Sequence, residues 1–390
     1  MSEIRLNELL FDSLFRENYE LKMVPSLVAE YRFKKGGSTM DITLKKGMKW
    51  QDGTPLTAKD VVFSIKAYQN KKTVSPNSRQ VAFIKDAVAS NDVELKLTFV
   101  KPEDNPERKL DFLILPAHKF QGKDFVTRND PFKNKPIGTG PFKLSNYGDD
   151  NSITLEKNAY FSSAVSISNV TMKEIPDKSQ QANLLKYESL DLVVKVLPKD
   201  VAALEENRKI ELYPYQTNSW WYIGFNFKNL VLSDARIRRA IASSINIEEL
   251  LKPIGTGDIL SGPFVKSSPY YNHEPDVKPA AINLVQAQEL FKAAGYVRKG
   301  DFWEKGGKPL TLRLSVPRSL DSAKEVVLNL QTQLSKGGVK VDPIWENDAS
   351  WKKKIWRDLD FDLVLSVWTF DAKEDLSLIH ISEPTRLRRI

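Results

Sequence analysis

The hydrophobic positions in the first half of the chain change period several times, and each period predicts a different kind of element. From Met40 to Leu44 apolar and polar residues alternate, which is typical of a half-buried strand, and Val93 to Val100 predicts another strand. Proline, asparagine, aspartate and lysine are frequent between Lys101 and Lys135, so loops with short helices are expected there. A helix is predicted near the amino terminus from the apolar residues Leu9, Leu10, Leu14 and Phe15.

The second half of the chain alternates helical and strand patterns. Helices are predicted after a cap at Ser233 or Asp234, from Asn283 to Ala294, and from Ala323 to Leu334. Strands are predicted over Thr311 to Val316 and over Val339 to Ile344. Glycines follow the second and third helices, where a left-handed residue commonly ends a helix. This order of elements predicts an α/β lobe in which helices cover a sheet.

The stretch from Trp50 to Ser64 reads W-Q-D-G-T-P-L-T-A-K-D-V-V-F-S and combines a turn with a helix start. Asp52 and Gly53 predict the turn, because glycine tolerates positive φ and the carboxylate can accept from nearby amides. Thr57 and Asp60 have the spacing of a capping box. Taken alone, the stretch predicts a strand, turn and helix corner of an α/β protein.

Composition narrows the class of protein. A chain of 390 residues with 41% hydrophobic and 28% charged residues predicts a soluble globular protein of two or three domains. The net charge of +8 is spread along the chain, and no nucleic-acid-binding module is recognisable, so we expect no nucleic-acid partner. Without cysteines there is no disulfide framework and no thiolate metal site. No apolar run reaches the ~18 residues of a membrane span, and Met1 to Leu6 lack the apolar core of a signal peptide.

Catalytic motifs find little support. Gly138-Thr-Gly140 lacks the spacing of a phosphate loop and predicts a turn before a strand at Phe142 to Leu144. No G-x-S-x-G elbow is present, and no serine, histidine and aspartate constellation can be proposed. Asp360 and Asp362 have strand spacing and could mimic the carboxylate pair of a glycosidase, but we expect both to be exposed to solvent. Neither a cofactor nor a metal site is predicted.

Four segments in this order resemble the extracytoplasmic solute-binding proteins of the dipeptide and oligopeptide type, family 5. They are Trp50 to Ser64; Pro136-Ile-Gly-Thr-Gly-Pro-Phe142; Tyr222 to Asn226 followed by Leu232 to Ala242; and Gln286 to Tyr296. The resemblance covers the chain from about Leu9 to Asp371. It is specific for the family and leaves the ligand open.

The resemblance implies an α/β, two-lobed fold like that of the type II periplasmic binding proteins, with an extra subdomain in lobe one and mixed sheets covered by helices. Lobe one would span residues 1–220, with the subdomain at about 32–135, and lobe two would span 227–365. Crossover strands near Trp220 to Phe225 and Leu363 to Trp368 would form the hinge. Residues 366–375 would begin the return to lobe one.

The resemblance also implies a ligand site. An acidic residue three positions after a tryptophan holds the ligand's α-amino group in relatives, and Asp371 after Trp368 matches that place. A turn-capping role for Asp371 is the alternative. Trp368, Phe370, Trp220 and Tyr222 are expected to line the site as apolar walls, although core packing explains these aromatic residues equally well. Arg313 and Arg318 are candidates for binding a ligand carboxylate, without support from a motif.

We therefore expect a substrate-binding component of an ABC importer, which captures short peptides in an inter-lobe cleft and delivers them to the membrane permease. It would be a monomer without a cofactor and not an enzyme. It would lie in the periplasm or on the outer face of the cytoplasmic membrane as a lipid-anchored protein. Two alternatives stay open: a ligand-sensing domain of a transcriptional regulator, and a carbohydrate-active enzyme using Asp360 or Asp362.

The end of the chain has a different character. Residues Leu376 to Arg386 read L-S-L-I-H-I-S-E-P-T-R, which resembles the translation of an adapter used in sequencing libraries. We expect residues 376–390 to be such a tail and the protein to be truncated at its carboxyl end. A short native strand with a basic end is the alternative.

Overall fold

The computed structural model divides the chain into two compact units, one within the first 176 residues and one within residues 177–371. It describes residues 3–18, 20, 22–34, 36–73, 75, 77–120, 123, 125–127, 130–215, 217, 219–255, 257–260, 262, 264–266, 271 and 281–369. The boundary lies earlier than residue 220, where the sequence places the end of lobe one; the limits of the functional lobes stay a prediction. No helix among the described residues is long and apolar enough to cross a membrane.

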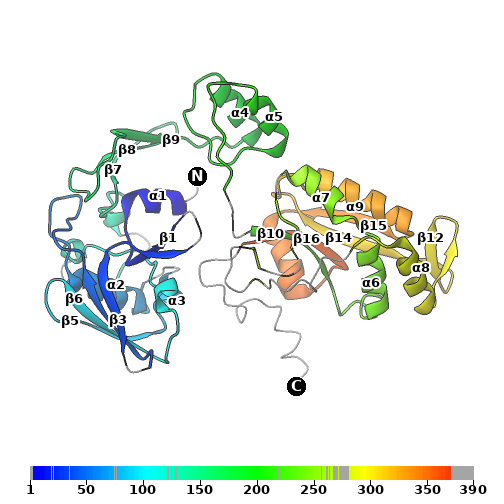
Figure 1. Cartoon of the computed structure of the whole chain (residues 1–390), viewed down its shortest axis with the longest axis horizontal. Helices are drawn as coiled ribbons and strands as arrows, with labels where there is room; N and C mark the ends of the chain where they lie inside the picture. Colours follow the sequence, from blue (N-terminus) through cyan, green and yellow to red (C-terminus); the bar gives the residue numbers. More distant parts are fainter. Residues whose placement is uncertain are drawn as a thin grey trace. The chain divides into compact units, whose positions relative to one another are not determined.

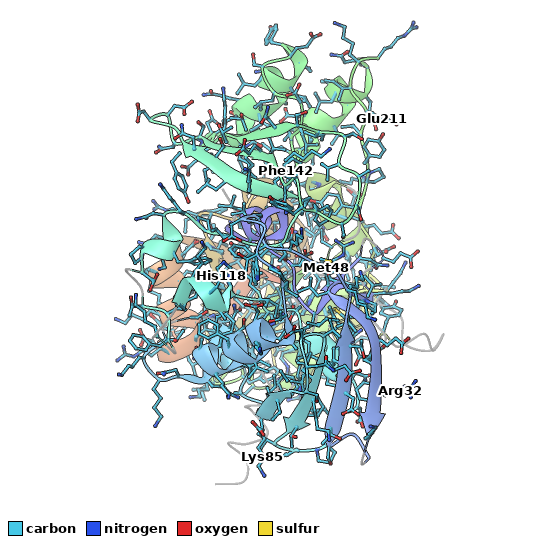
Figure 2. The ribbon with its side chains drawn as sticks, turned by 90° about the vertical axis from the view of Figure 1, so that its left-hand side faces the viewer. Arg32, Met48, Lys85, His118, Phe142 and Glu211 are labelled. Carbon is cyan, nitrogen blue, oxygen red and sulfur yellow. The ribbon has the colours of Figure 1, made fainter. Side chains whose placement is uncertain are left out.

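The first unit contains an antiparallel sheet of four strands in the order β3-β4-β6-β5. The strands are β3 (Val28–Lys34), β4 (Thr39–Leu44), β5 (Ile84–Ala89) and β6 (Glu94–Phe99). The alternation predicted for β4 is confirmed, because Met40, Ile42 and Leu44 are all buried, and β6 lies where the second strand is predicted. Strand β3 forms an edge of the sheet and carries the exposed Arg32, which is labelled in Figure 2.

Helix α2 (Ala58–Gln69) packs on this sheet and begins as the sequence predicts. The backbone N–H of Thr57 donates to Asp60 Oδ2 at 2.8 Å, which is one half of the capping box. Val61 and Ile65 on the inner face of the helix are fully buried in the core. The turn before the helix is confirmed as well: Thr54 N–H donates to Asp52 Oδ1 at 3.1 Å, and Gly53 has φ +86°.

The amino-terminal helix is shorter than predicted. Helix α1 (Glu3–Leu10) ends before Leu14, and Phe15 begins strand β1 (Phe15–Glu17), which pairs with β2 (Met23–Pro25). The prediction of a helix through Phe15 is therefore wrong. Tertiary contacts decide the conformation here, because Phe15 N–H donates to Leu110 O and Ser26 N–H to Leu14 O. Leu14 and Phe15 are buried, but in the core of the first sheet rather than along a helix.

A second sheet of the first unit has the order β7-β8-β9, with β7 (Phe142–Tyr147), β8 (Ile153–Lys157) and β9 (Asn169–Met172). The turn predicted before β7 is confirmed. A Cβ atom on Gly138 would lie 1.9 Å from Leu10 O, so only glycine fits against the end of α1. The expected loops with short helices also form, as η1 (Pro106–Lys109), η2 (Ala117–Phe120) and η3 (Pro131–Lys133); α3 (Asn77–Gln80) lies farther upstream.

The second unit is built on a mixed sheet of four strands in the order β10-β16-β14-β15 (Figure 1). The strands are β10 (Ser219–Phe225), β14 (Thr311–Pro317), β15 (Lys340–Glu346) and β16 (Leu363–Thr369). Strand β14 runs parallel to both β15 and β16, whereas β10 is antiparallel to β16. The two strands that the sequence assigned to the crossover segments are thus direct neighbours.

Helices of the second unit bury one face of this sheet. Asp234 caps α6 (Ala235–Ser243), Asn283 caps α8 (Leu284–Ala293), and α9 (Ala323–Gly337) ends at Gly338 with φ +87°. Their apolar residues pack on Leu312, Leu314 and Val316 of β14 in one core. All three predicted helices are confirmed. The other elements are α4 (Lys178–Lys186), α5 (Pro198–Glu205), α7 (Ile247–Leu251), η4 (Lys252–Ile254), β11 (Val297–Lys299), β12 (Phe302–Lys305), β13 (Lys308–Pro309), α10 (Asp348–Lys352) and the π-helix η5 (Lys353–Asp358).

Candidate functional site

Three of the five predicted site residues lie on the neighbouring strands β10 and β16. Trp220 and Tyr222 belong to β10, and Trp368 belongs to β16. Phe370 and Asp371 lie outside the described residues. The described part of the site is therefore the end of β16 and the strand beside it.

The register of the two strands determines which side chains share a face. Trp220 pairs with Trp368, and Tyr222 pairs with Ser366. Residues directly opposite one another point to the same side of a sheet, so Trp220, Tyr222 and Trp368 share one face. Trp221 packs in the helix-covered core on the other face. The predicted alternation of Trp220, Trp221 and Tyr222 is confirmed.

The aromatic rings on this face contact one another in pairs. Trp220 and Tyr222 have ring centroids 5.1 Å apart at an interplanar angle of 48°. Trp368 contacts Trp356 of the π-helix η5 edge to face, with centroids 5.9 Å apart at 68°. We call Trp220, Tyr222, Trp368 and Trp356 the aromatic face.

Tyr222 is the titratable member of the aromatic face. Burial raises the pKa of its hydroxyl above the usual value, and a hydrogen bond with Ser366 offsets part of that rise. The hydroxyl is therefore neutral at physiological pH. Its ring also packs against a small core formed by Trp351, Ile355, Phe361 and Val364. Tyr222 thus combines a structural contact with a place on the aromatic face.

Sequence reasoning missed Trp356. Its spacing of five residues from the buried Trp351 does not fit the inner face of an α-helix, so an α-helical pattern places it toward solvent. In η5 the backbone bonds run to the fifth residue, and the wider turn changes where each side chain points. The conspicuous W-x-x-x-x-W spacing from Trp351 to Trp356 was the one signal in the sequence.

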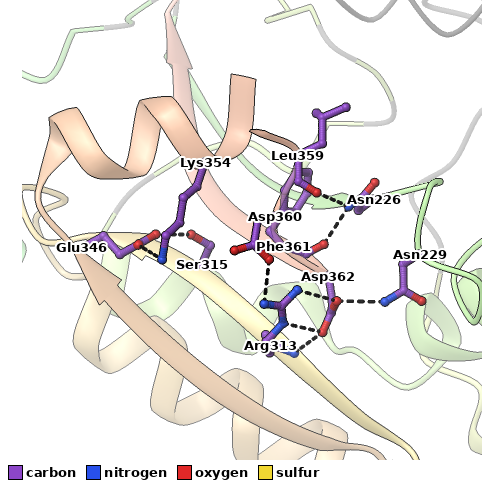
Figure 3. A network of polar contacts seen from close by, with 10 residues as sticks. All are labelled: Asn226, Asn229, Arg313, Ser315, Glu346, Lys354, Leu359, Asp360, Phe361 and Asp362. Atoms are coloured by element: carbon purple, nitrogen blue, oxygen red, sulfur yellow. Dashed lines mark hydrogen bonds and ion pairs between the residues drawn. The ribbon is translucent and has the colours of Figure 1, made fainter. Parts of the chain in front are cut away.

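At the opposite end of β16 from Trp368, a network of polar contacts holds the start of the strand (Figure 3). Asp362 accepts four hydrogen bonds: from Arg313 N at 2.8 Å, Nε at 3.3 Å and Nη2 at 3.3 Å, and from Asn229 Nδ2 at 2.8 Å. Asp360 accepts from Arg313 Nη1 at 2.8 Å. Asp362, and after it Asp360, raise the pKa of the Arg313 guanidinium above its usual value. One arginine thus binds both carboxylates.

The same network continues to the loop before β16 and to β15. Asn226 Nδ2 donates to Leu359 O at 2.9 Å and to Phe361 O at 2.7 Å, which holds the loop against the end of β10. Glu346 accepts from Ser315 Oγ at 3.0 Å and forms an ion pair with Lys354 of η5. These contacts fix η5 and the start of β16 on the sheet.

The network corrects one prediction about the carboxylate pair. Asp360 is exposed as expected, but Asp362 is only 8% exposed, so the prediction of an exposed Asp362 is wrong. The error has a physical cause, since four hydrogen bond donors compensate the burial of this carboxylate. A glycosidase needs one carboxyl group free to give a proton and another free to attack, and an arginine bound to both opposes that chemistry.

The two arginines considered for a ligand carboxylate also differ. Arg313 is bound to Asp360 and Asp362, so binding a ligand carboxylate would require it to leave these partners. Arg318 is exposed at the end of β14, where its backbone N–H donates to Glu346 O at 2.8 Å. Both side chains are exposed, but that of Arg313 is occupied by its two ion pairs.

In the first unit, the motif around Trp50 is a structural corner with a charged cluster. Asp52 Oδ2 lies 2.8 Å from His118 Nε2 and 2.9 Å from Lys119 Nζ of η2. Burial alone would raise the pKa of the Asp52 carboxyl, but hydrogen bonds from Lys119 and His118 hold that pKa well below its usual range. These contacts join the turn to η2.

Gln51, next to this cluster, is buried and binds only backbone groups. Its Nε2 donates to Leu10 O at 2.9 Å and to Phe142 O at 2.7 Å, and its Oε1 accepts from Gly138 N at 2.9 Å. One side chain therefore links three segments that are distant in the sequence. Depressions in the surface of the first unit lie elsewhere, one beside Asn70 and Ser78 and another beside Glu174.

Comparison with known families identifies the class of this chain. The model of the bacterial extracellular solute-binding proteins, family 5 middle, matches residues 22–383. The chain belongs to this family. The resemblance drawn from the four sequence segments is confirmed at the level of the family.

One curated relative of this solute-binding protein is the oligopeptide-binding protein AppA of Bacillus subtilis (strain 168). The two are 26% identical over 389 residues, which cover 97% of this chain and 72% of AppA. The match therefore extends along almost the whole of the solute-binding protein described above, and AppA is longer.

Solved structures support the fold of the solute-binding protein. AppA from Bacillus subtilis in complex with a nonapeptide has a TM-score of 0.75 at 24% identity, with 96% of this chain and 76% of that chain covered. NikA from Brucella suis in complex with Fe(III)-EDTA has a TM-score of 0.81 at 20% identity, covering 97% and 77%. The type II periplasmic-binding-protein-like α/β fold is confirmed.

Proposed function

We propose that this protein is the extracytoplasmic substrate-binding component of an ABC importer, which captures short peptides in a cleft between its lobes and delivers them to the permease. Family 5 membership supports a role in binding a solute outside the cytoplasm. AppA, an oligopeptide-binding protein, supports a peptide as the ligand. The protein would act as a monomer, either in the periplasm or as a lipid-anchored protein on the outer face of the membrane.

The observation that carries the proposal is the aromatic face at the end of β16. Trp220 and Trp368 lie opposite each other on paired strands, and the chain continues from β16 toward Asp371. In surroundings of low polarity an ammonium group interacts with a carboxylate much more strongly than in water, and aromatic side chains would supply such surroundings. We assign Asp371 to the ligand's α-amino group, with Trp368, Phe370, Trp220 and Tyr222 as apolar walls for its side chains.

The binding step would be a change of equilibrium between open and closed forms. A ligand shifts such an equilibrium only by the difference in its affinity for the two forms. Contacts made in the closed form alone would therefore drive closure. Backbone hydrogen bonds would give affinity for any peptide, while the walls would accept varied side chains.

The alternatives have weaker support. AppA is named as an oligopeptide-binding protein, and neither AppA nor NikA is named as an enzyme. The carboxylates that a carbohydrate-active enzyme would use are bound to Arg313. A sensing domain of a transcriptional regulator would share the fold, so a DNA-binding domain encoded in the same gene would be the feature that favours it.

Calorimetry of the chain with alanine-based di- to pentapeptides tests the proposal. We expect peptides with a free amino end to bind, and their N-acetylated counterparts to bind much more weakly because they carry no ammonium group. Asp371→Ala should lower affinity by about 2 kcal/mol or more, roughly 30-fold, since a desolvated charge loses its partner. Asp371→Asn should also lower the affinity for the peptide.

Asp92→Ala serves as the matched control. Asp92 is an aspartate of the first unit with a side chain 75% exposed and an ion pair to Lys59 at 3.8 Å, so its removal should leave affinity unchanged. Fe(III)-EDTA, the ligand in the NikA structure, is the competing probe. Binding of Fe(III)-EDTA without binding of any peptide would refute the peptide proposal. Equal affinity of the parent and Asp371→Ala for peptides would refute only the role of Asp371.

A further inference from the structure

The aromatic face includes a residue that comes from neither of the paired strands. Trp356 lies on the π-helix η5, between β15 and β16 in the chain. It remains 44% exposed although it contacts Trp368. A large apolar side chain with this exposure, placed beside a predicted ligand residue, offers a surface that a ligand side chain can cover.

The position of Trp356 depends on contacts that hold η5 rigidly. Ile355, the preceding residue, is buried in the small core with Trp351 and Phe361. Lys354 forms an ion pair with Glu346 of β15. Trp356 is therefore carried by a segment anchored on both sides of the helix, and its ring is not placed by the contact with Trp368 alone.

The π-helical turn itself is unusual enough to need a reason. Such turns are rare and are found frequently at functional sites. Here the turn carries Trp356, whose indole ring lies at 68° to that of Trp368 with centroids 5.9 Å apart. This edge-to-face geometry is one that aromatic pairs prefer, and a third ring can extend it.

Trp356 is an apolar residue surrounded in the sequence by exposed charged residues, which we call the polar rim. Its neighbours Lys352, Lys353 and Arg357 are exposed, and Lys353 lies 3.9 Å from Asp358. A ligand side chain that reaches this rim finds apolar surface on Trp356 and hydrated charge around it. A ligand side chain that packs on the indole ring of Trp356 would therefore bind better than one that does not.

We propose that Trp356 is a specificity-determining residue that selects peptides with an aromatic side chain next to the Trp368 wall. The inference rests on the proposed function. The aromatic side chain would pack on Trp356 and continue the edge-to-face contact with Trp368. Peptides with a small side chain at that position would gain nothing from Trp356.

Calorimetry with pairs of tetrapeptides that differ only by phenylalanine or alanine at one position tests this inference. In the parent, the phenylalanine peptide should bind more tightly at one of the positions. Trp356→Ala should reduce that preference by about 3- to 10-fold, the worth of one aromatic pair, and change the affinity for the alanine peptide much less. Trp356→Phe keeps a ring at the site and should retain most of the preference.

Phe227→Ala is the matched control, because Phe227 is an aromatic residue of the same unit, 55% exposed, beyond the other end of β10. Phe227→Ala should leave the affinities for the phenylalanine peptide and the alanine peptide unchanged. If Trp356→Ala lowered the affinity for both peptides equally, and Trp356→Phe lowered them to the same extent, the role of Trp356 would be purely structural. That result would overturn the inference. An unchanged preference in Trp356→Ala would overturn it too. A parent that binds no peptide would overturn the proposed function itself, which separates the two failures.

Discussion

Removal of the Asp362 carboxylate should destabilise the second unit much more than removal of the Asp360 carboxylate. Both aspartates bind Arg313, and they are two residues apart. They differ in burial, since the side chain of Asp362 is 11% exposed and that of Asp360 is 54% exposed. The pair therefore compares a buried and an exposed partner of the same arginine.

The magnitude follows from the hydrogen bonds of each carboxylate. Asp362→Ala removes two short bonds at 2.8 Å, from the backbone N–H of Arg313 and from Asn229 Nδ2. A hydrogen bond to a charged group contributes about 1.5 kcal/mol or more, so the loss should be about 3 kcal/mol. The longer bonds from the guanidinium count for little, because that side chain is 44% exposed and can be hydrated instead. Asp360→Ala removes one exposed ion pair and should cost about 0.5 kcal/mol.

Urea unfolding followed by tryptophan fluorescence measures this difference. Of the eight tryptophans only Trp50 precedes Asp177, so the signal comes mainly from the second unit. With a slope of about 2 kcal/mol per molar urea, Asp362→Ala should lower the midpoint by about 1.5 M and Asp360→Ala by about 0.25 M. Equal shifts for the two variants, or no shift for Asp362→Ala, would refute the assignment of Asp362 as the buried anchor of β16.

Two further predictions concern the first unit. Gln51→Ala should cost about 2–4 kcal/mol, because its three buried backbone partners lose their hydrogen bonds, and faster amide exchange at Gly138 would reveal it. Asp52→Asn should destabilise the unit at neutral pH, because bonds from Lys119 and His118 lower the pKa of Asp52 in the folded state. A lowered pKa gives stability above the unfolded value of about 3.9, so the difference from the parent should narrow as pH falls below about 4. A stability difference between the parent and Asp52→Asn that stays constant below about pH 4 would contradict this reasoning.

The sequence predicted those elements whose signals are local. The capping box at Thr57 and Asp60 and the cap at Asp234 each specify a helix start within four residues, and the observed helices begin there. The alternation of β4 reports burial on one face, which the sheet confirms. Leu14 and Phe15 show the limit of this reasoning, because pairing with residues farther along the chain overrode a helical spacing.

From local sequence patterns, only the site residues that lie on the same strand could be placed together. Alternation gave the common face of Trp220 and Tyr222, and the family resemblance added Trp368. Arg313 could not be assigned to Asp362, because the two are 49 residues apart and no local pattern joins them. Trp356 required the backbone geometry of η5, which the sequence spacing does not specify.

The pairing of β16 places its two ends under different constraints. Leu363 and Val364 pair with β14 on one side and with β10 on the other, and the network around Asp362 holds the residue just before them. From Leu365 to Thr369 the described ladder joins β16 to β10 alone. Segments with fewer backbone partners open at lower free energy, so the end that carries Trp368 is the more adaptable half of the strand. The end with Trp368 can therefore adjust while the buried Asp362 keeps the strand in register, which would suit the proposed binding of peptides with varied side chains.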